Sequence, residues 1–278
     1  MHNFIPNLIL TRVMGSLANS KNTLIKWFLI NSFIKIYQPK LEESLISDIK
    51  DFPTYNSFFT RELKKEARPI ESSELTIVSP VDGTITDHGI VENNMLIQAK
   101  KHSYPLEELL GNEPQNTNGS QHYFITIYLA PRDYHRIHCP YEGLVSSTSH
   151  IGESLFSVNK KAQVNIPYLY IKNERAVIKI ESSLLSYSLV SVGASIVGSI
   201  VPFWSDLESN TRKDYIKEWN QGPKEEERQA LKGQELAHFK MGSTVILVFE
   251  DSSKLDLHSL TTNKAVKFGS KLINLKNL

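Results

Sequence analysis

The 278-residue sequence has a single cysteine, no long hydrophobic run and almost no net charge. Because Cys139 has no second cysteine to pair with, an intrachain disulfide and a multi-cysteine metal site are excluded. The net charge of +1 gives no overall basic excess for binding phosphate backbones, so no nucleic acid partner is expected. Trp27 to Ile34 is charge-free but short, whereas a helix needs about 20 apolar residues to span a bilayer. Apolar and charged contents of 40% and 22% are those of a globular protein.

The N-terminal 40 residues combine apolar runs with an entirely basic charge. Their five charged side chains are Arg12, Lys21, Lys26, Lys35 and Lys40. Wound as a helix, residues 21–37 place Lys21, Asn31, Ser32 and Lys35 on one arc, while Leu24, Trp27, Phe28, Ile34 and Tyr37 lie mostly elsewhere. Such a helix can lie among the headgroups of an anionic membrane, or pack its apolar face against its own domain. The segment alone leaves both interpretations open.

The first 65 residues have a helical pattern, and the residue pattern changes after them. From Leu75 onward, short β-rich runs alternate with turn residues. Examples of these runs are Leu75–Val78, Gly83–Ile85, Met95–Gln98, Tyr123–Leu129, Ala176–Ile180, Leu185–Val192 and Thr244–Phe249. One helix-like segment (Leu106–Leu110), a polar loop (Asn112–Gln121) and a charged, exposed excursion (Leu207–Gly233) interrupt them. The pattern predicts an α+β protein with an N-terminal helical layer (1–65) and a mostly antiparallel, β-rich domain (66–278).

Two stretches of the β-rich region carry proton-handling groups. Asp82 lies in Ser79-Pro80-Val81-Asp82-Gly83, where an aspartate before glycine is by itself ordinary turn chemistry. The stretch from Ala130 to Pro140 contains His135 and His138, and histidine is the usual proton carrier near neutral pH. No acidic or cysteine partner stands at metal-ligand spacing, so no metal is expected there. The alternative for this stretch is a charge-rich surface loop.

Two further stretches are rich in small residues. Val192 to Ile200 is typical of a glycine-bearing strand that another backbone or a ligand approaches closely, and no helix-opening pattern follows that would make it a dinucleotide site. Gly242 and Ser243 precede an apolar run, where the local interpretation is a tight turn. Glycine nevertheless has no Cβ to block attack on its carbonyl, which is a requirement of self-cleavage.

Taken in order, these stretches resemble the phosphatidylserine decarboxylase family of bacterial type. The resemblance runs from Phe58-Phe59-Thr60-Arg61 and Arg68-Pro69-Ile70 to Met241-Gly242-Ser243-Thr244. It implies a proenzyme that cuts itself between Gly242 and Ser243 into a β chain (1–242) and an α chain (243–278). The two chains would form an αβ heterodimer, with further association of such units.

The resemblance also implies a role for each reactive residue. Asp82 would orient His138, and His138 would take the proton from Ser243, as in a serine hydrolase triad, with Gly242 supplying the carbonyl. Ser243 would then become a covalent pyruvoyl cofactor, which forms a Schiff base with phosphatidylserine and acts as an electron sink. His135 would handle the substrate or its proton. The products would be CO₂ and phosphatidylethanolamine, a step of phospholipid biosynthesis.

A lipid substrate favours docking of the N-terminal layer on a membrane, with the enzyme peripheral on the cytoplasmic face of the cell membrane. The sequence departs from the family pattern at four positions. Lys101, Glu153 and Ala237 stand where glycine is usual, and Met241 stands where leucine is usual. None of these departures removes a reactive group.

Three other functions are alternative interpretations of the same sequence features. A serine hydrolase would employ the same three residues, but no Gly-x-Ser-x-Gly elbow surrounds Ser243. A non-enzymatic β module with a membrane-facing arm would remain an intact chain without a reactive carbonyl. A pyruvoyl decarboxylase for a soluble amino acid is the closest alternative, and the apolar N-terminal layer and the Pro131–Pro140 block argue against it.

Overall fold

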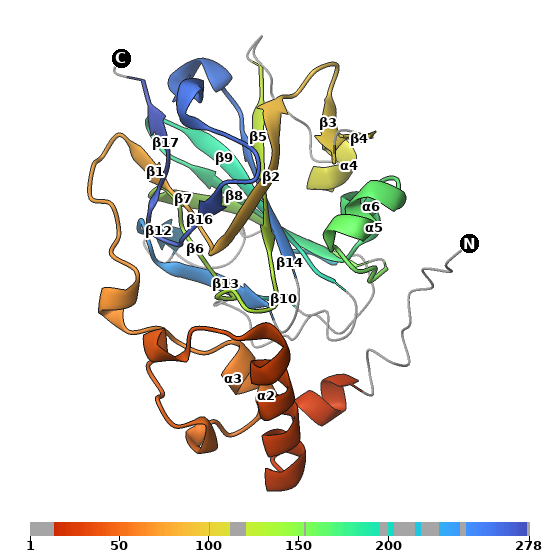
Figure 1. Cartoon of the computed structure of the whole chain (residues 1–278). Coiled ribbons are helices and arrows are strands. Elements are labelled where there is room, and N and C mark those ends of the chain that lie inside the picture. The colour runs from red at the N-terminus through yellow and green to blue at the C-terminus, as the bar shows by residue number, and fades with distance from the viewer. Residues whose placement is uncertain are drawn as a thin grey trace.

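The computed structural model describes residues 14–99, 101–111, 121–152, 154–194, 200–202, 215–217, 228–239 and 243–276. A helical segment lies beneath a β-rich body built around a large curled sheet (Figure 1). Every pair of neighbouring strands in the described part of the chain is antiparallel. The α+β prediction with a mostly antiparallel sheet is therefore confirmed, whereas the boundary at residue 65 stays a prediction.

The helical segment packs around a small aromatic core. Helix α2 (Thr23–Tyr37) begins at Asn22, whose side chain accepts the N–H groups of Leu24 and Ile25. Helix α3 (Tyr55–Phe59) begins with a capping box. Ile30 and Phe33 of α2 pack with Phe52, Tyr55, Phe58 and Phe59. Three 3₁₀ turns complete the segment: η1 (Leu41–Glu43), η2 (Ile49–Asp51) and η3 (Lys65–Ala67).

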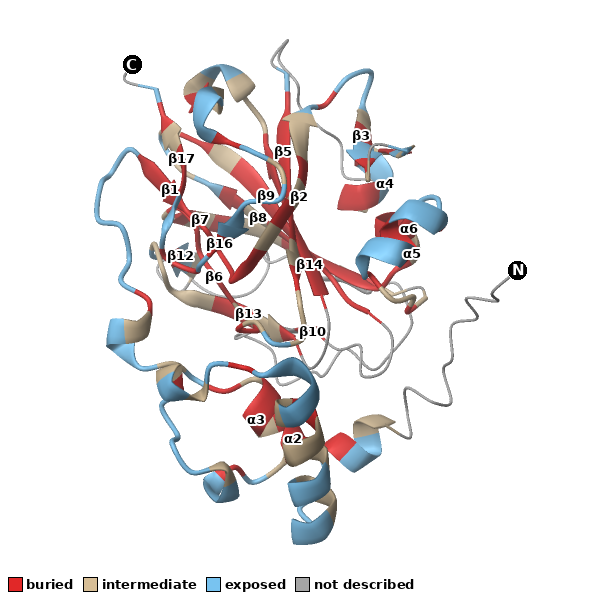
Figure 2. Ribbon diagram, in the orientation of Figure 1, coloured by how far each residue is buried: buried red, intermediate tan, exposed pale blue. Residues whose placement is uncertain are grey.

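Apolar side chains of α2 lie on both its packed and its exposed sides. Leu24, Trp27 and Phe28 are 78%, 58% and 64% exposed, and Figure 2 shows the exposed residues along this helix. Lys26 lies on the packed side, where its ammonium donates to the carbonyls of Lys50 and Phe52. Packing of one apolar side against the protein itself is thus present, the other apolar side lies in solvent, and membrane docking stays a prediction. Among the described helices, none is long and apolar enough to cross a bilayer.

The large sheet carries the centre of the fold. Its strand order is β11 (Tyr215–Lys217), β7 (Gly143–Ile151), β8 (Arg175–Glu181), β9 (Ser186–Val192), β14 (Ser243–Phe249), β5 (Tyr123–Leu129), β2 (Gly83–Ile90) and β16 (Ala265–Val266), and β12 (Gln229–Ala230) pairs with β7. Strand β14 hydrogen-bonds to β5 on one side and to β9 on the other. The sequence following Gly242 therefore forms a central strand.

Two small sheets cover one face of the large sheet. They have the orders β1 (Thr76–Val78), β17 (Lys271–Leu275), β15 (Leu255–Asp256) and β10 (Ile200–Pro202), β13 (Glu235–Phe239), β6 (Arg136–His138). The main hydrophobic core lies between them and the large sheet. A second core lies on the opposite face, under α4 (Leu106–Leu110), α5 (Lys160–Asn165), α6 (Leu169–Lys172) and the hairpin β3 (Met95–Gln98) to β4 (His102–Pro105). The 3₁₀ turns η6 (Ser252–Lys254) and η7 (Leu257–Ser259) precede β16.

Candidate active site

The candidate nucleophile Ser243 is the first residue of β14. It pairs with Leu129, the last residue of β5, so it lies where the Ala130–Pro140 stretch leaves the sheet. Its side chain is fully buried and its Oγ has no hydrogen-bond partner in the described part of the chain. Leaving a buried hydroxyl unpaired costs about 1–3 kcal/mol, so such a group calls for an explanation. Gly242 and Met241 lie outside the described residues.

The stretch after β5 folds back toward the approach to Ser243. Asp133 accepts the N–H of Ala130 at 2.8 Å, which closes a turn directly after the strand. The carbonyl of His135 then accepts the N–H of Phe239 at 2.9 Å, four residues before Ser243. The end of β5, both predicted histidines and the start of β14 are thereby brought to one end of the molecule.

His135 presents an unprotonated nitrogen in a buried position. Its Nδ1 lies 2.8 Å from the Asp133 carbonyl, which can only accept, so Nδ1 carries the proton. Its Nε2 is then a bare lone pair, and it has no partner among the described residues. Burial lowers the pKa of His135 to about 3, and the Phe59 ring lies 4.2 Å away between centroids. The ring is therefore neutral at pH 7, and its Nε2 can accept a hydrogen bond.

His138 has the same tautomer, fixed by a different carbonyl. Its Nδ1 donates to Gly233 at 2.9 Å, and its Nε2 accepts from the Tyr134 hydroxyl at 3.2 Å. Gly233 has a φ of +82°, and a side chain there would overlap Ile70, so the position requires glycine. Burial lowers the pKa of His138 to about 4. Both histidines thus have an unprotonated Nε2 at neutral pH, and burial makes each a weaker base than a free imidazole.

Asp82 is connected to His138 indirectly, through the residue Phe268. Its carboxylate accepts the main-chain N–H of Phe268 at 2.8 Å, and the Phe268 ring stacks on the His138 ring at 3.6 Å between centroids and 15° between planes. No hydrogen bond joins Asp82 to His138 in the described structure. The sequence-based prediction that Asp82 orients His138 stays a prediction, and Phe268 is the physical link that the structure offers for it.

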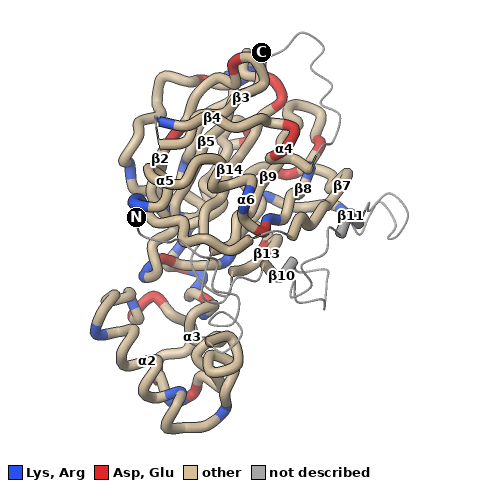
Figure 3. Tube along the Cα trace, turned by 90° about the vertical axis from the view of Figure 1, so that its right-hand side faces the viewer, with Lys and Arg blue, Asp and Glu red and all other residues tan. Residues whose placement is uncertain are grey.

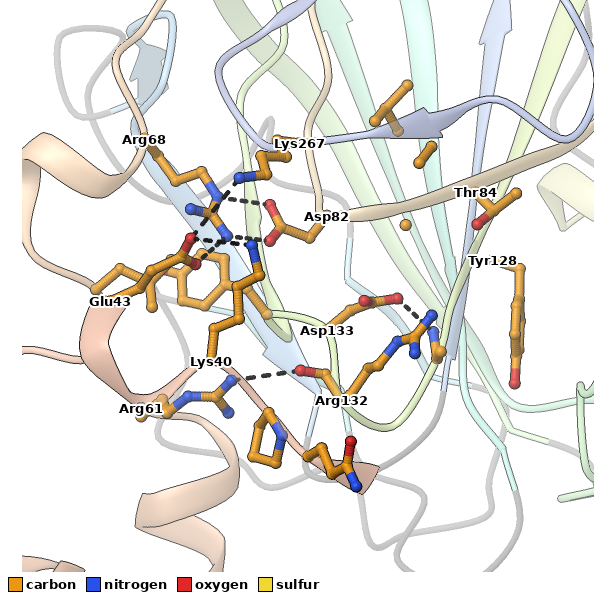
Figure 4. A pocket seen from close by; sticks show the side chains of 18 of the residues that line it. Lys40, Glu43, Arg61, Arg68, Asp82, Thr84, Tyr128, Arg132, Asp133 and Lys267 are labelled. Atoms are coloured by element: carbon orange, nitrogen blue, oxygen red, sulfur yellow. Dashed lines mark hydrogen bonds and ion pairs between the residues drawn. The ribbon is translucent and has the colours of Figure 1, made fainter. Parts of the chain in front are cut away.

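Arg68 holds Asp82 from the other side. It donates to both carboxylate oxygens at 2.9 and 2.5 Å and to Glu43 of the helical segment at 2.7 Å (Figure 4). Burial alone would raise the pKa of Glu43, but the hydrogen bond from Arg68 and the positive charges of Arg68, Lys267 and Lys40 together lower it. Lys267 also lies 3.7 Å from Glu43. These contacts join the helical segment, the Asp82 turn and the C-terminal region.

Comparisons with known proteins identify the family. A family model described as phosphatidylserine decarboxylase matches residues 55–274, and a second one, described as PSD, matches residues 1–38. The chain belongs to the phosphatidylserine decarboxylase family. It is therefore an enzyme, and its class is that of the decarboxylases.

Curated relatives of this phosphatidylserine decarboxylase family are similar over most of the chain. The sequence is 40% identical over 253 residues to the phosphatidylserine decarboxylase proenzyme of Baumannia cicadellinicola, covering 88% of this chain and 85% of the relative. The proenzyme of Coxiella burnetii is 40% identical over 253 residues, covering 90% and 88%. That of Erwinia tasmaniensis is 36% identical over 275 residues, covering 98% and 92%.

A pocket of about 480 Å³ opens beside the Asp82 turn of this decarboxylase family member. It is lined by residues of the helical segment, of β2 and β5, and of the loop after β5 (Figure 4). Tyr134 and Asp82 reach it, whereas Ser243 and the two histidines do not line it. Gly83 stands at its floor, where a side chain would collide with the Tyr128 carbonyl. The pocket is thus adjacent to the buried histidines and separated from them by Tyr134 and the Asp82 turn.

Sequence reasoning did not assign Arg68, Gly233, Tyr134 or Phe268 to the site. Arg68 was visible as part of the Arg-Pro-Ile motif, while nothing local marks Phe268 or the Gly233 carbonyl. Of the departures from the family pattern, Ala237 is buried in β13 and Lys101 is exposed in the β3–β4 turn. Glu153 and Met241 lie outside the described residues.

Proposed function

We propose that this chain decarboxylates phosphatidylserine to phosphatidylethanolamine, using a pyruvoyl group that it makes from Ser243 by cutting itself after Gly242. Membership of the decarboxylase family and the word proenzyme in the relatives' names support this function. The observation that carries the proposal is the buried Ser243 hydroxyl, which has no partner among the described residues and stands at the start of a central strand, beside the end of β5 from which the histidine-bearing stretch departs.

Self-cleavage begins with attack of Ser243 Oγ on the Gly242 carbonyl. The peptide C–N bond breaks, an ester forms, and the serine nitrogen becomes an amine that takes up the proton. Loss of the Ser243 α-proton then expels the Gly242 carboxylate from Cβ and leaves a dehydroalanine. Water adds to its imine form and ammonia departs, which leaves the pyruvoyl group. The balance is one water consumed and one ammonia released for each chain.

His138 fits the role of base in the first step. Its Nε2 lone pair accepts the Tyr134 hydroxyl at 3.2 Å, a weak bond that Ser243 can replace. Its Nδ1–H is held by Gly233, which keeps the ring in the tautomer that a base requires. The negative charge of Asp82 favours the imidazolium that forms, and its bond to Phe268 fixes the ring stacked on His138.

The residues around Ser243 also fit the pyruvoyl group itself. An unpaired buried Oγ marks the position of the atom that would be lost from the side chain. The group supplies a ketone that binds the substrate amine and draws in the electrons left behind by departing CO₂. His135 Nε2 is a buried lone pair without a partner among the described residues, and we propose that it stabilises the bound substrate or handles its proton.

The cut chain would stay together as an αβ heterodimer. Strand β14 begins the α chain and is hydrogen-bonded to β5 and β9 of the β chain. Strand β17 of the α chain pairs with β1. The α chain thus occupies the middle of one sheet and the middle of another, and its side chains form part of the main core. Further association of such heterodimers stays a prediction.

We propose that α2 docks the enzyme on the cytoplasmic face of the cell membrane. The double substitution Trp27→Ser and Phe28→Ser removes two large exposed apolar side chains, each worth about 1.5–3 kcal/mol when buried. We expect at least a tenfold loss of binding to phosphatidylserine vesicles in a sedimentation assay. Leu231→Ser, which removes an exposed leucine of the β-rich body, should change binding little. Equal losses for both variants would contradict docking through α2.

The substrate proposal is tested by supplying carboxyl-labelled phosphatidylserine in vesicles and, separately, labelled free serine. We expect the purified protein to release labelled CO₂ from the lipid and to leave phosphatidylethanolamine. Release from free serine at an equal or higher rate would favour the decarboxylase for a soluble amino acid. Ester or amide hydrolysis without CO₂ would favour the serine hydrolase.

A further inference from the structure

Arg61 is a buried cation without a matching anion. It follows α3, is 3% exposed, and lines the pocket beside the Asp82 turn. Among the described residues, its Nε and one terminal nitrogen have no hydrogen-bond partner, and the other terminal nitrogen makes a single long bond of 3.4 Å to the Arg132 carbonyl. Within the described residues, no carboxylate forms an ion pair with it. The Phe58 ring, 5.8 Å from the guanidinium, offers only a weak cation–π contact.

The two other arginines that are buried in the described part of the chain, Arg68 and Arg175, have several hydrogen-bond partners each. Arg68 binds two carboxylates, and Arg175 donates to four main-chain carbonyls. Buried charges in proteins are normally paired, because an unpaired charge costs several kcal/mol. Arg61 differs in that its free N–H groups border a cavity. An anion from outside the chain would supply what the fold does not.

The pocket has an excess of positive charge. Six basic side chains and three acidic ones line it, and Figure 3 shows charges of both signs gathering where the helical segment meets the β-rich body. Two of the acids, Glu43 and Asp82, are already neutralised by Arg68. The third, Asp133, accepts the Ala130 N–H, and burial raises its pKa. Arg61 and the exposed Arg132 and Lys160 are left to attract an anion.

Arg61 also contacts the loop that holds His135. The carbonyl of Arg132 accepts from Arg61, and the carbonyl of the next residue, Asp133, accepts from His135. Phe59, two residues before Arg61, packs its ring on the His135 ring. A ligand bound by Arg61 would therefore lie on the other side of this loop from the proposed reaction centre.

We propose that Arg61 binds the phosphodiester of the phospholipid headgroup. This inference rests on the proposed function, which supplies a substrate with two anions, a phosphodiester and a carboxylate. The carboxylate loses its charge as CO₂ forms, so a guanidinium bound to it would stabilise the substrate more than the transition state. The phosphodiester keeps its charge throughout, and holding it positions the headgroup without opposing the reaction.

The test measures binding and turnover separately. Glycerophosphoethanolamine, which has the phosphodiester but no carboxylate and no acyl chains, is titrated by NMR into the full-length protein and into Arg61→Gln, Arg61→Lys and Lys271→Gln. We expect Arg61→Gln to weaken binding roughly 10- to 100-fold, Arg61→Lys to restore part of it, and Lys271→Gln, outside the pocket, to change nothing. In turnover, Arg61→Gln should raise the KM for phosphatidylserine more than it lowers kcat.

Two outcomes would overturn the proposal. One is a wild-type protein that does not bind glycerophosphoethanolamine, or an Arg61→Gln variant, folded as judged by its melting temperature, that binds it as well as wild type does. The other is an Arg61→Gln variant that loses discrimination for glycerophosphoserine while its affinity for glycerophosphoethanolamine is unchanged, which would assign Arg61 to the carboxylate. Because these titrations need neither cleavage nor decarboxylation, failure of the proposed function is scored separately, by the mass of the chain and by CO₂ release.

Discussion

Ser243→Ala should yield a single uncut chain of 31.6 kDa with no decarboxylase activity. The substitution removes the oxygen that attacks the Gly242 carbonyl and later leaves from Cβ with the Gly242 carboxylate, so neither the ester nor the dehydroalanine that precedes the ketone can form. Because the Oγ has no hydrogen-bond partner among the described residues, we expect its loss to leave the fold intact. The measurement is denaturing gel electrophoresis of the purified variant together with CO₂ release from phosphatidylserine vesicles.

Ser191→Ala is the matched control for this prediction. Ser191 is also fully buried with an unpartnered Oγ, and it lies on β9, opposite Val245 of β14. It should be cut and active like the wild type. A Ser243→Ala chain that is still cut, or that still releases CO₂, would remove Ser243 from the chemistry.

Arg68→Met should lower the free energy of unfolding by about 3–5 kcal/mol, because it leaves the buried Asp82 carboxylate without its cation and takes the nearest cation from the partly exposed Glu43. The Arg68 side chain is 7% exposed, so water cannot replace it fully. The measurement is urea unfolding in the Ser243→Ala background, where the chain is uncut and one unfolding transition can be analysed.

Two variants test the physical reason for that loss. Adding Asp82→Asn to Arg68→Met should recover part of the stability, because the amide is neutral and its oxygen can still accept the Phe268 N–H. Lys40→Met removes a 63% exposed cation, 4.0 Å from the same Glu43, and should cost less than about 1 kcal/mol. If Lys40→Met costs as much as Arg68→Met, burial of the Arg68 pair is not the cause.

Elements marked by compact apolar runs could be predicted from the sequence. The runs Tyr123–Leu129 and Met95–Gln98 are β5 and β3, and Leu106–Leu110 is α4. Strand β7 was missed because its sequence, Gly143–Ile151, is rich in serine, threonine and histidine. Helices α5 and α6 are six and four residues long, too short for a helical period to appear. Asn112–Gln121 and most of Leu207–Gly233 lie outside the described residues, apart from Gln121, β11 and residues 228–233.

The residues of the candidate site also fall into two groups, those that the sequence marks and those that it does not. His135, His138 and Ser243 lie in local motifs, so they could be selected from the sequence and the family resemblance. Their supports are distant along the chain: 14 residues separate Arg68 from Asp82, 95 separate His138 from Gly233, and 186 separate Asp82 from Phe268. A main-chain carbonyl that fixes a tautomer has no side-chain signature. Such contacts appear only when the strands are placed in space.

Intact-mass measurement of the purified wild-type protein, before and after borohydride treatment, tests the proposed self-processing most directly. We expect a piece of about 4 kDa, since residues 243–278 are 36 of the 278 residues of a 31.6-kDa chain. Its N-terminus should be blocked and should gain two hydrogens on reduction, as a ketone does. A single uncut chain, or a 4-kDa piece with a free serine amine and no gain on reduction, would contradict the pyruvoyl account.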